Sequence, residues 1–314
     1  MSFSRTVKEE LVENINAARH CQISELASLI QYAGHFFKDE ADVYKLRIQT
    51  ENRFVAKKCF VLWKKVFGTT PKIAVRVHSG AGKAMVYIIE TTELLELQKL
   101  LLTLKMVIIP AENECGLVQR DILLKHQCCK RAFLRGAYLA IGSMSDPDKS
   151  YHLEFVCQTQ NAAKDLVEVL ADFELDAKIV IRKKYFVVYL KEGEGIVDLL
   201  NIMEAHVALM NLENTRILKD MRNSINRRVN CETANIAKTV NAATKQVEDI
   251  QLIQTMMGIE KLPANLIQIA EVRLNYPDAT LKELGDLLDP PIGKSGVNHR
   301  LRKLGEIAER LRGE

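Results

Sequence analysis

Near the C-terminus, one short segment combines hydrogen-bond donors with positive charge. Within ten positions it contains Lys294, Ser295, Asn298, His299, Arg300, Arg302 and Lys303. Asparagine and arginine can form paired hydrogen bonds with base edges in the major groove, whereas lysine is better suited to phosphate. Val297, Leu301 and Leu304 recur at helical spacing, so the segment is predicted to be an amphipathic helix whose polar face contacts duplex DNA. A charged face is also the ordinary exterior of a helical bundle, which leaves that alternative open.

Two groups of cysteine and histidine contain the atoms that soft metal ions bind. His126, Cys128 and Cys129 lie close together, and His20 and Cys21 occupy the equivalent place earlier in the chain. Adjacent cysteines do not have the ligand spacing of known structural zinc sites, and cysteine also serves as a small core residue. The seven cysteines form no CxxC pairs, which argues against a disulfide framework as well. We therefore predict core packing here, with no metal and no cofactor.

Carboxylates offer a second possible metal site. His35, Asp39 and Glu40 follow one predicted helix, and Asp146 and Asp148 follow another. The two later aspartates flank a proline in a sequence typical of turns, and the others fit a polar loop, so metal catalysis is the weaker interpretation. The glycine-rich Gly80-Ala81-Gly82 lacks the context of a phosphate-binding loop.

Two helices that end in glycine must organise the first two thirds of the chain. Leu26–Gly34 reads LASLIQYAG, Phe133–Gly142 reads FLRGAYLAIG, and the final glycines lie 108 positions apart. Gly136 and Ala140 fall one turn apart on one helical face, which allows another helix to approach closely. We expect these two helices to pack against each other.

Similar segments recur around both helices. Leu46–Asn52 (LRIQTEN) returns as Phe155–Asn161 (FVCQTQN), and Pro71–Val77 (PKIAVRV) returns as Ala177–Lys183 (AKIVIRK). A nearly constant offset across helices and strands indicates an internal repeat. The strands are predicted at Val43–Thr50, Lys72–Val77, Met85–Glu90, Ile179–Lys183 and Tyr185–Lys191, and further helices at Phe54–Phe67, Thr92–Leu104 and Ile196–Met203. Two αββαββα units should share one long, curved, mostly antiparallel sheet surface.

The last third of the chain has only helical patterns. We place a hinge at Arg222–Asn230, with Asn230 or Thr233 capping a helix that Gly258 stops. Further helices are predicted at Ala264–Asn275 and at Leu281–Leu288, the second of them after a capping box of Thr280 and Glu283. The last helix is predicted to begin after a cap at Ser295, and Ser4 should cap the first helix of the chain. A short helix followed by a basic one is the arrangement of a helix-turn-helix.

The glycine-terminated helices resemble the LAGLIDADG motif of homing endonucleases. That resemblance implies two motif helices side by side on a pseudo-twofold axis, ending above DNA, with an acid at the eighth position of each motif to bind catalytic divalent metal. Here those positions hold Ala33 and Ile141, neither of which can bind a metal ion. The resemblance therefore implies a degenerate scaffold without catalytic residues.

Three longer segments resemble the WhiA family of sporulation and cell-division regulators of Gram-positive bacteria. They are Phe133–Pro147, Arg227–Thr239 and Asn275–Leu304. The resemblance implies an inactive homing-endonuclease-like domain joined to a DNA-binding helix-turn-helix, with roles in transcription, cell division and chromosome segregation. His20-Cys21 departs from the cysteine pair that the family pattern leads us to expect, which puts no function in doubt.

These observations define the fold and function that we expect. The fold class is α+β, with a duplicated homing-endonuclease-like saddle at 1–222 (repeats at about 1–112 and 113–222) and an all-α helix-turn-helix domain at 223–314. The 314 residues carry a net charge of +4, so a DNA-binding surface requires local clustering of basic residues. The N-terminus has no apolar signal segment, which predicts a cytoplasmic, nucleoid-associated protein that binds neither membrane nor small-molecule substrate.

The expected function is that of a non-enzymatic DNA-binding regulator, with a possible protein partner in transcription or division. Two alternatives remain open. One is a divergent metal-dependent endonuclease that uses relocated carboxylates, and the other is a scaffold whose saddle holds a protein partner in cell division.

Overall fold

A computed structural model of the chain describes residues 2–38, 40, 42–77, 85–91, 93–109, 114–117 and 119–313. It consists of two compact units, Met1–Leu218 and Lys219–Glu314. The predicted boundary between 222 and 223 stays a prediction. Asp39, Gly80-Ala81-Gly82 and the predicted helix start at Thr92 lie outside the described residues.

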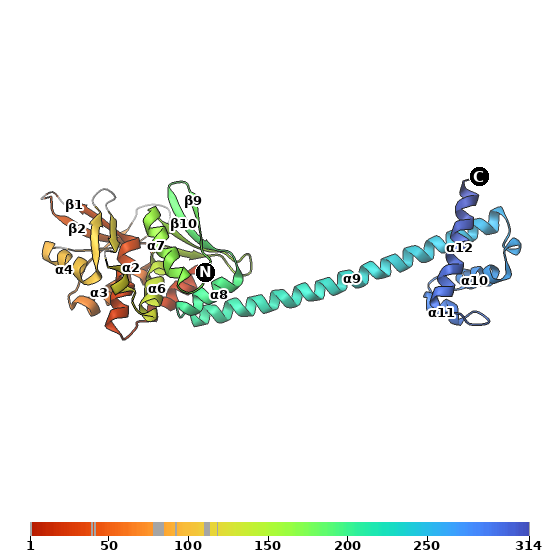
Figure 1. The fold of residues 1–314 in the computed structure, drawn as a ribbon, viewed down its shortest axis with the longest axis horizontal. Helices are drawn as coiled ribbons and strands as arrows, with labels where there is room; N and C mark the ends of the chain where they lie inside the picture. Colours follow the sequence, from red (N-terminus) through yellow and green to blue (C-terminus); the bar gives the residue numbers. More distant parts are fainter. Residues whose placement is uncertain are drawn as a thin grey trace. The chain divides into compact units, whose positions relative to one another are not determined.

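The first unit contains two halves that, after the opening helix, repeat the same order of elements, and Figure 1 shows these halves side by side. The first half comprises α1 (Phe3–Glu13), α2 (Arg19–Ala33), β1 (Gly34–Lys38), β2 (Tyr44–Thr50), α3 (Arg53–Phe67), β3 (Lys72–Val77), β4 (Met85–Glu90) and α4 (Leu94–Leu104). The second half comprises α6 (Gln127–Ile141), β7 (Gly142–Met144), β8 (Leu153–Cys157), α7 (Gln160–Ala171), β9 (Lys178–Arg182), β10 (Tyr185–Leu190) and α8 (Gly193–Ile202). Between them lie β5 (Met106–Ile109), β6 (Glu114–Leu117) and the short α5 (Arg120–Leu123). The predicted duplicated αββαββα architecture is confirmed.

Each half forms its own four-stranded antiparallel sheet. The strand orders are β1-β2-β4-β3 and β7-β8-β10-β9, and β5 pairs with β6 in a separate two-stranded sheet. Equivalent registers recur, with Gly34 opposite Ile48 in one half and Gly142 opposite Phe155 in the other. The expected surface is therefore divided between two sheets among the described residues, instead of one continuous hydrogen-bonded sheet. Each motif glycine is the first residue of a strand.

The helices α2 and α6 pack side by side at the centre of the first unit (Figure 1). A Cβ added at Gly136 would lie 2.5 Å from the carbonyl oxygen of Glu25 and 2.9 Å from Cβ of Ser28. Only glycine fits at this crossing, which confirms the close approach that the sequence predicts. Leu26, Leu29, Phe133 and Ala137 are fully buried in the surrounding core.

Two local predictions for the first unit are wrong. The sequence predicts a polar loop at His35, but His35 lies in β1, where exposed His35 alternates with buried Phe36. Ser4 was assigned as a helix cap, yet α1 begins at Phe3, and Ser2 occupies the cap position without a side-chain cap. Ser4 Oγ instead lies 3.4 Å from Oη of Tyr138.

The last helix of the first unit continues into the second. α9 spans His206–Met256 and is followed by a 3₁₀ turn at Ile259–Lys261, α10 (Ala264–Asn275), α11 (Leu281–Asp286) and α12 (Lys294–Arg312). The predicted hinge at Arg222–Asn230 and the helix starts at Asn230 and Thr233 are wrong, because this stretch contains neither glycine nor proline to interrupt α9. Gly258 follows the helix with a φ of +90°, as expected for a stop.

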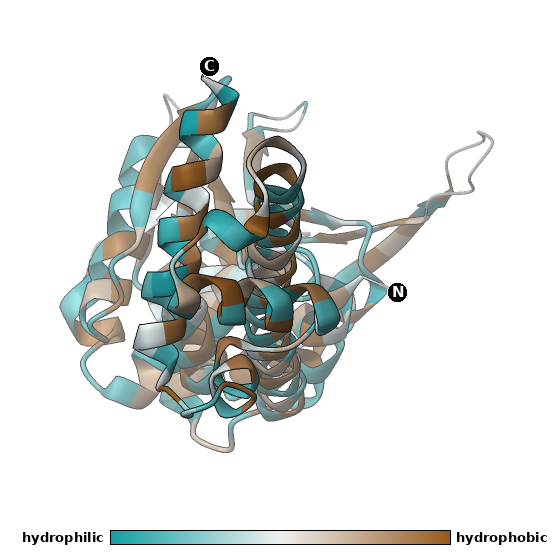
Figure 2. Ribbon diagram, turned by 90° about the vertical axis from the view of Figure 1, so that its right-hand side faces the viewer, coloured by the Kyte–Doolittle hydropathy of each residue, from teal (hydrophilic) through white to brown (hydrophobic). Residues whose placement is uncertain are grey.

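The second unit has a core of its own. Ile253 of α9, Ile269 of α10, Leu284 of α11 and Val297 of α12 are all fully buried and belong to one apolar cluster. In Figure 2, apolar and polar residues alternate along the helix that ends at the C-terminus. Among the described residues, no helix is long and apolar enough to span a membrane.

Candidate nucleic-acid interface

The short helix α11 packs against α12, the helix that is predicted to contact DNA. Thr280 and Glu283 form the predicted capping box: Thr280 Oγ1 accepts from the backbone N–H of Glu283 at 3.3 Å, and Glu283 Oε2 accepts from that of Thr280 at 2.7 Å. Gly285 lets the chain fold back, because a Cβ there would lie 2.2 Å from the carbonyl oxygen of Ile292. The connection, residues 287–293, is longer than the three or four residues of a standard helix-turn-helix turn.

α12 separates its apolar and polar residues onto opposite faces. Its buried residues are Val297, Leu301, Leu304 and Ala308. The first turn contains no acidic residue. The predicted cap at Ser295 is wrong, because the helix begins at Lys294 after Gly293, and Ser295 is the second helical residue. Without a capping role, the Ser295 hydroxyl is exposed on the polar face.

The structure places most of the predicted DNA-binding residues on one exposed face. The exposed set consists of Lys294, Ser295, Asn298, His299, Arg302 and Lys303. Arg302 Nε lies 3.4 Å from Glu306 Oε1 in an ion pair that is open to solvent. Arg300 differs, because it is half-buried and its guanidinium donates to the carbonyl oxygen of Asn265 at 3.4 Å. That contact attaches Arg300 to α10, away from the exposed face. DNA contact by each of these residues stays a prediction.

Polar contacts from α9 hold the C-terminal part of α12. Arg312 Nη2 lies 2.7 Å from Asp249 Oδ1, and Asp249 is almost fully buried. Lys245 and Glu309 add an exposed ion pair at 3.4 Å. The sequence offered no signal for these contacts, because they join residues more than sixty positions apart.

The C-terminal ends of α2 and α6 lack the ligands of a nuclease site. Ala33 and Ile141 occupy the motif positions and are half-buried. A cleft of about 590 Å³ reaches Gly142, and its charged lining consists of Arg5, Lys8, Arg53 and Glu51. Three basic groups and one acid favour an anion over a divalent cation. The basic lining was not predicted from the sequence, since α1 and α3 contribute it from segments about fifty residues apart.

Lys8 is the basic residue of this cleft that contacts a motif helix. Its Nζ donates to the carbonyl oxygen of Leu139 at 3.1 Å, near the C-terminal end of α6. Burial lowers the pKa of Lys8 to about 8. The ammonium group also lies 5.8 Å from the centre of the Tyr138 ring. A cation therefore lies near a helix end where a nuclease of this fold class would need carboxylates.

The carboxylates considered as relocated ligands are engaged in a turn or are dispersed. Asp146 Oδ1 accepts from the backbone N–H of Asp148 at 3.0 Å, so this segment is the turn that the sequence indicates. Both aspartates are exposed, as are His35 and Glu40. Within the part of the chain that the structure describes, none of these side chains belongs to a group that could hold a metal ion.

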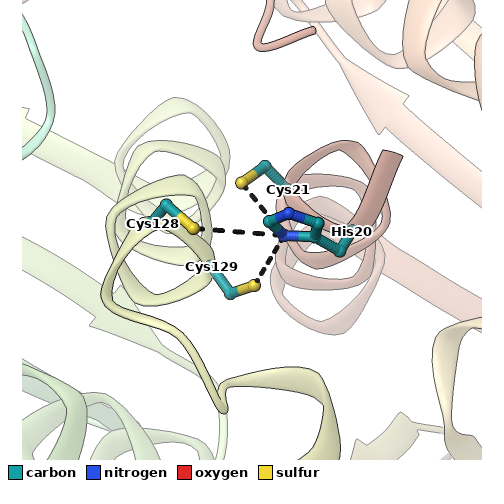
Figure 3. Close-up of side chains that lie close together, drawn as sticks. All are labelled: His20, Cys21, Cys128 and Cys129. Atoms are coloured by element: carbon teal, nitrogen blue, oxygen red, sulfur yellow. Dashed lines mark hydrogen bonds between the residues drawn. The ribbon is translucent and has the colours of Figure 1, made fainter. Parts of the chain in front are cut away.

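The cysteine and histidine residues converge at the other end of the motif helices. His20, Cys21, Cys128 and Cys129 place one ligand atom each within 4.8 Å of one another. Figure 3 shows two of the residues coming from each helix, with the three sulfurs on one side of the imidazole of His20. Cys21 and Cys129 are buried, as core packing predicts, whereas His20 and Cys128 are exposed. His126 is the fifth member of the predicted group, and the centre of its ring lies 5.6 Å from that of His20, with the two rings tilted by 53°.

Three family models match most of the chain. They are the WhiA N-terminal LAGLIDADG-like domain at residues 19–107, the WhiA LAGLIDADG-like domain at 130–222, and the WhiA C-terminal HTH domain at 225–308.

Full-length relatives and a solved structure agree with these matches. A probable cell division protein WhiA of Lachnoclostridium phytofermentans is 49% identical over 312 residues, covering 99% of this chain and 100% of the relative. One from Alkaliphilus oremlandii is 48% identical over 313 residues, covering 99% and 98%. The crystal structure of full-length DUF199/WhiA from Thermatoga maritima matches with a TM-score of 0.59 at 25% identity, covering 99% of both chains.

Proposed function

Because this chain belongs to the WhiA family, whose curated relatives carry the name of cell division proteins, we propose that it is a non-enzymatic regulator that binds duplex DNA through the exposed face of α12. Its biological roles would be transcription control, including sporulation where that occurs, cell division and chromosome segregation. The protein would act in the cytoplasm on the nucleoid. No cofactor is part of this proposal.

One observation carries the DNA-binding proposal. Asn298, His299 and Arg302 lie in the first turns of α12 and are exposed, while Val297 and Leu301 of the same turns are buried. A recognition helix contacts base edges with residues near its N-terminus. The polar groups therefore face outward along the part of α12 that would enter a major groove in a recognition helix.

The test separates base contact from phosphate contact. Arg302→Ala should weaken binding to the preferred duplex by about 1–3 kcal/mol and binding to scrambled duplex much less, since a paired base contact is lost. Lys303→Ala should weaken both and reduce the dependence of affinity on salt, since a phosphate contact is lost. Competitive binding at two salt concentrations measures both effects. Equal losses on both duplexes for Arg302→Ala would assign this residue to phosphate and refute the proposed orientation of α12.

The absence of catalysis is the second part of the proposal. The motif positions Ala33 and Ile141 supply no oxygen ligand, and the adjacent cleft is lined mainly by Arg5, Lys8 and Arg53. A divalent ion requires carboxylate or carbonyl oxygens, so the described part of this region favours binding without hydrolysis. We expect no linearisation of plasmid DNA with Mg²⁺ or Mn²⁺. Cleavage that chelator abolishes, and that Asp146→Asn or Asp148→Asn also removes, would support the alternative of a relocated nuclease site.

A protein partner is a second candidate function, and the outer strands of the first unit favour it. β3 and β9 are the edges of their sheets, and all of their residues are exposed. They include Val77 and Ile181, whose exposed fractions are 59% and 68%. Exposed edge strands with apolar side chains are surfaces to which another protein strand can add. Replacing Val75 and Ile181 with lysine should then abolish partner capture from cell extract while leaving DNA affinity unchanged.

A further inference from the structure

The N-terminal ends of α2 and α6 bring together four side chains that metal ions of intermediate softness prefer. Cys129 Sγ lies 3.2 Å from His20 Nδ1, and the Sγ atoms of Cys21 and Cys128 lie 3.4 and 4.0 Å from the same nitrogen. Three sulfurs thus face one imidazole nitrogen from the same side of the ring, as Figure 3 shows. Three thiols and an imidazole are one of the ligand sets of structural zinc sites.

The spacing of these atoms fits a tetrahedral ion. With Zn–S near 2.3 Å and Zn–N near 2.0–2.1 Å, a tetrahedron separates sulfur from nitrogen by about 3.6 Å and sulfur from sulfur by about 3.8 Å. The three observed sulfur-to-nitrogen distances, 3.2, 3.4 and 4.0 Å, lie on both sides of the first value. All four ligand atoms lie within 4.8 Å of one another. The largest separation therefore exceeds the tetrahedral sulfur-to-sulfur value by no more than about 1 Å, a difference that side-chain movement can close around an ion.

The electrostatic surroundings suit a metal-bound thiolate cluster. Cys21 lies in the first turn of α2, and Cys128 and Cys129 lie in the first turn of α6, where helix N-termini stabilise negative charge. Burial of Cys21 and Cys129 does not prevent ligation, because metal coordination deprotonates a thiol outright. The exposed His20 and Cys128 leave the ion a path of entry from solvent.

The ligands also follow the internal repeat. The offset of 108 positions that relates Gly34 to Gly142 also relates His20 to Cys128 and Cys21 to Cys129. Each half of the first unit therefore contributes one pair of ligands from equivalent positions. The spacing within either half does not match a known zinc motif, and this is why the sequence indicated core packing. The site is complete only when the two halves are assembled.

We propose that His20, Cys21, Cys128 and Cys129 bind one Zn²⁺ ion, which joins the N-terminal ends of α2 and α6. The ion would be structural, because four protein ligands fill a tetrahedral shell and leave no position for water or substrate. It lies at the opposite end of these helices from Ala33 and Ile141, where a nuclease would hold its metal. The inference concerns assembly of the first unit and is independent of how α12 contacts DNA.

Zinc content of the full-length protein, purified under reducing conditions and measured by mass spectrometry of the metal, is the first test. Wild type should carry one zinc per chain. The variants His20→Ala and Cys128→Ser change exposed ligands, which limits their effect on folding. Each variant should carry at least tenfold less zinc than the wild type. Cys231→Ser is the matched control, because this exposed thiol accepts from Asn235 within α9 and lies outside the ligand group, and it should retain one zinc. Equal zinc content in wild type and both ligand variants would overturn the proposal.

Cobalt supplies a readout that is independent of affinity. Co²⁺ added to the metal-free protein should give the visible spectrum of a tetrahedral cobalt thiolate, and Cys128→Ser should weaken the sulfur-to-cobalt charge-transfer band, because two thiolates remain in place of three. His126→Ala should keep the spectrum, since this ring neighbours His20 without belonging to the ligand set. Loss of the spectrum in His126→Ala but not in His20→Ala would overturn the assignment. A disulfide between Cys21 and Cys129 in freshly reduced wild-type protein, detected by alkylation and mass spectrometry, would also overturn it.

Discussion

The helix pair α2–α6 and the helix pair α11–α12 differ in where their polar residues lie. In α2, Gln22, Ser24, Glu25, Ser28 and Gln31 are all buried, and several of them contact other parts of the first unit. Ser24 Oγ, for example, donates to the carbonyl oxygen of Cys129 at 2.8 Å. In α12 the polar residues of the first turns face solvent, apart from the half-buried Arg300, and the buried residues are all apolar.

The two helix pairs also differ in whether their charged side chains are buried or exposed. Glu25 and Lys58 form a fully buried ion pair at 3.0 Å, with Arg135 Nε 3.7 Å from the same carboxylate oxygen. Burial raises the pKa of Glu25, while Lys58 and Arg135 oppose that shift. On α12, the Arg302–Glu306 pair near the start of the helix is exposed to water, whereas the Arg312–Asp249 pair at its end includes a nearly buried carboxylate. Charge around the α2–α6 pair is thus part of the core, whereas charge on the first turns of α12 remains available to a partner.

The largest expected difference is in the free energy of unfolding, when one lysine is removed from each unit in turn. Lys58→Met should destabilise the first unit by about 3–5 kcal/mol, because it leaves Glu25 buried with a weakened set of partners. Lys58 also donates to the carbonyl oxygens of Leu11 and Asn14, which lose a donor. Lys245→Met is the matched control, since Lys245 forms an exposed pair with Glu309, and it should cost less than about 1 kcal/mol. Urea unfolding of both variants measures the two costs. Similar losses of stability would show that the buried Glu25–Lys58 pair contributes no more than an exposed ion pair.

A smaller effect is expected from one methyl group placed between α2 and α6. Gly136→Ala should destabilise the first unit by roughly 1–3 kcal/mol, because the new Cβ would lie 2.5 Å from a backbone oxygen that cannot rotate away. Gly195→Ala in α8 is the control. A Cβ at Gly195 meets only side-chain atoms at 3.9 Å or beyond, so this variant should be neutral or slightly stabilising. Thermal unfolding distinguishes the two, and a neutral Gly136→Ala would mean that the helices can separate at no cost.

The sequence predicted local structure well where local residues decide it. The α10 bounds, the capping box of Thr280 and Glu283 and the exposed face of α12 all followed from spacing and composition. Gly136 was also recognised, because a glycine one turn from a small residue predicts a close helix crossing. These features depend on residues within a few turns of one another.

Features that depend on distant residues were not predicted. The burial of Lys58 and Arg135 follows from their meeting with Glu25, which no spacing in the sequence indicates. The convergence of His20 with Cys128 requires the two halves to be packed, although the repeat offset was already visible. The continuous α9 was missed for another reason: a polar stretch was interpreted as a hinge, but polarity alone does not end a helix.

The α11–α12 pair should respond moderately to loss of its cap. Thr280→Ala should destabilise the second unit by about 1 kcal/mol, because the hydroxyl no longer accepts from the backbone of Glu283. The fragment Lys219–Glu314 is suited to this measurement, since its apolar core is its own. Thr244→Ala is a control, as its hydroxyl donates within α9 to the carbonyl oxygen of Val240 and caps no helix. Equal losses of stability in both variants would show that the capping box does not stabilise the second unit.

The smallest expected effect is the pH dependence of the same cap. The backbone N–H of Thr280, followed by its side chain, lowers the pKa of the Glu283 carboxyl. A carboxyl whose pKa is lower in the folded state than in the unfolded state stabilises the fold above the unfolded pKa, and this contribution disappears as the pH falls through the folded pKa. The advantage of wild-type Lys219–Glu314 over Glu283→Gln should therefore be constant near neutral pH and decline below about pH 4.3, the ordinary value for glutamate. Denaturant unfolding at a series of pH values measures it. An advantage that instead grew in acid would show that Glu283 acts through its protonated form, and the α11 cap would then resemble the buried Glu25 more than its own exposed position suggests.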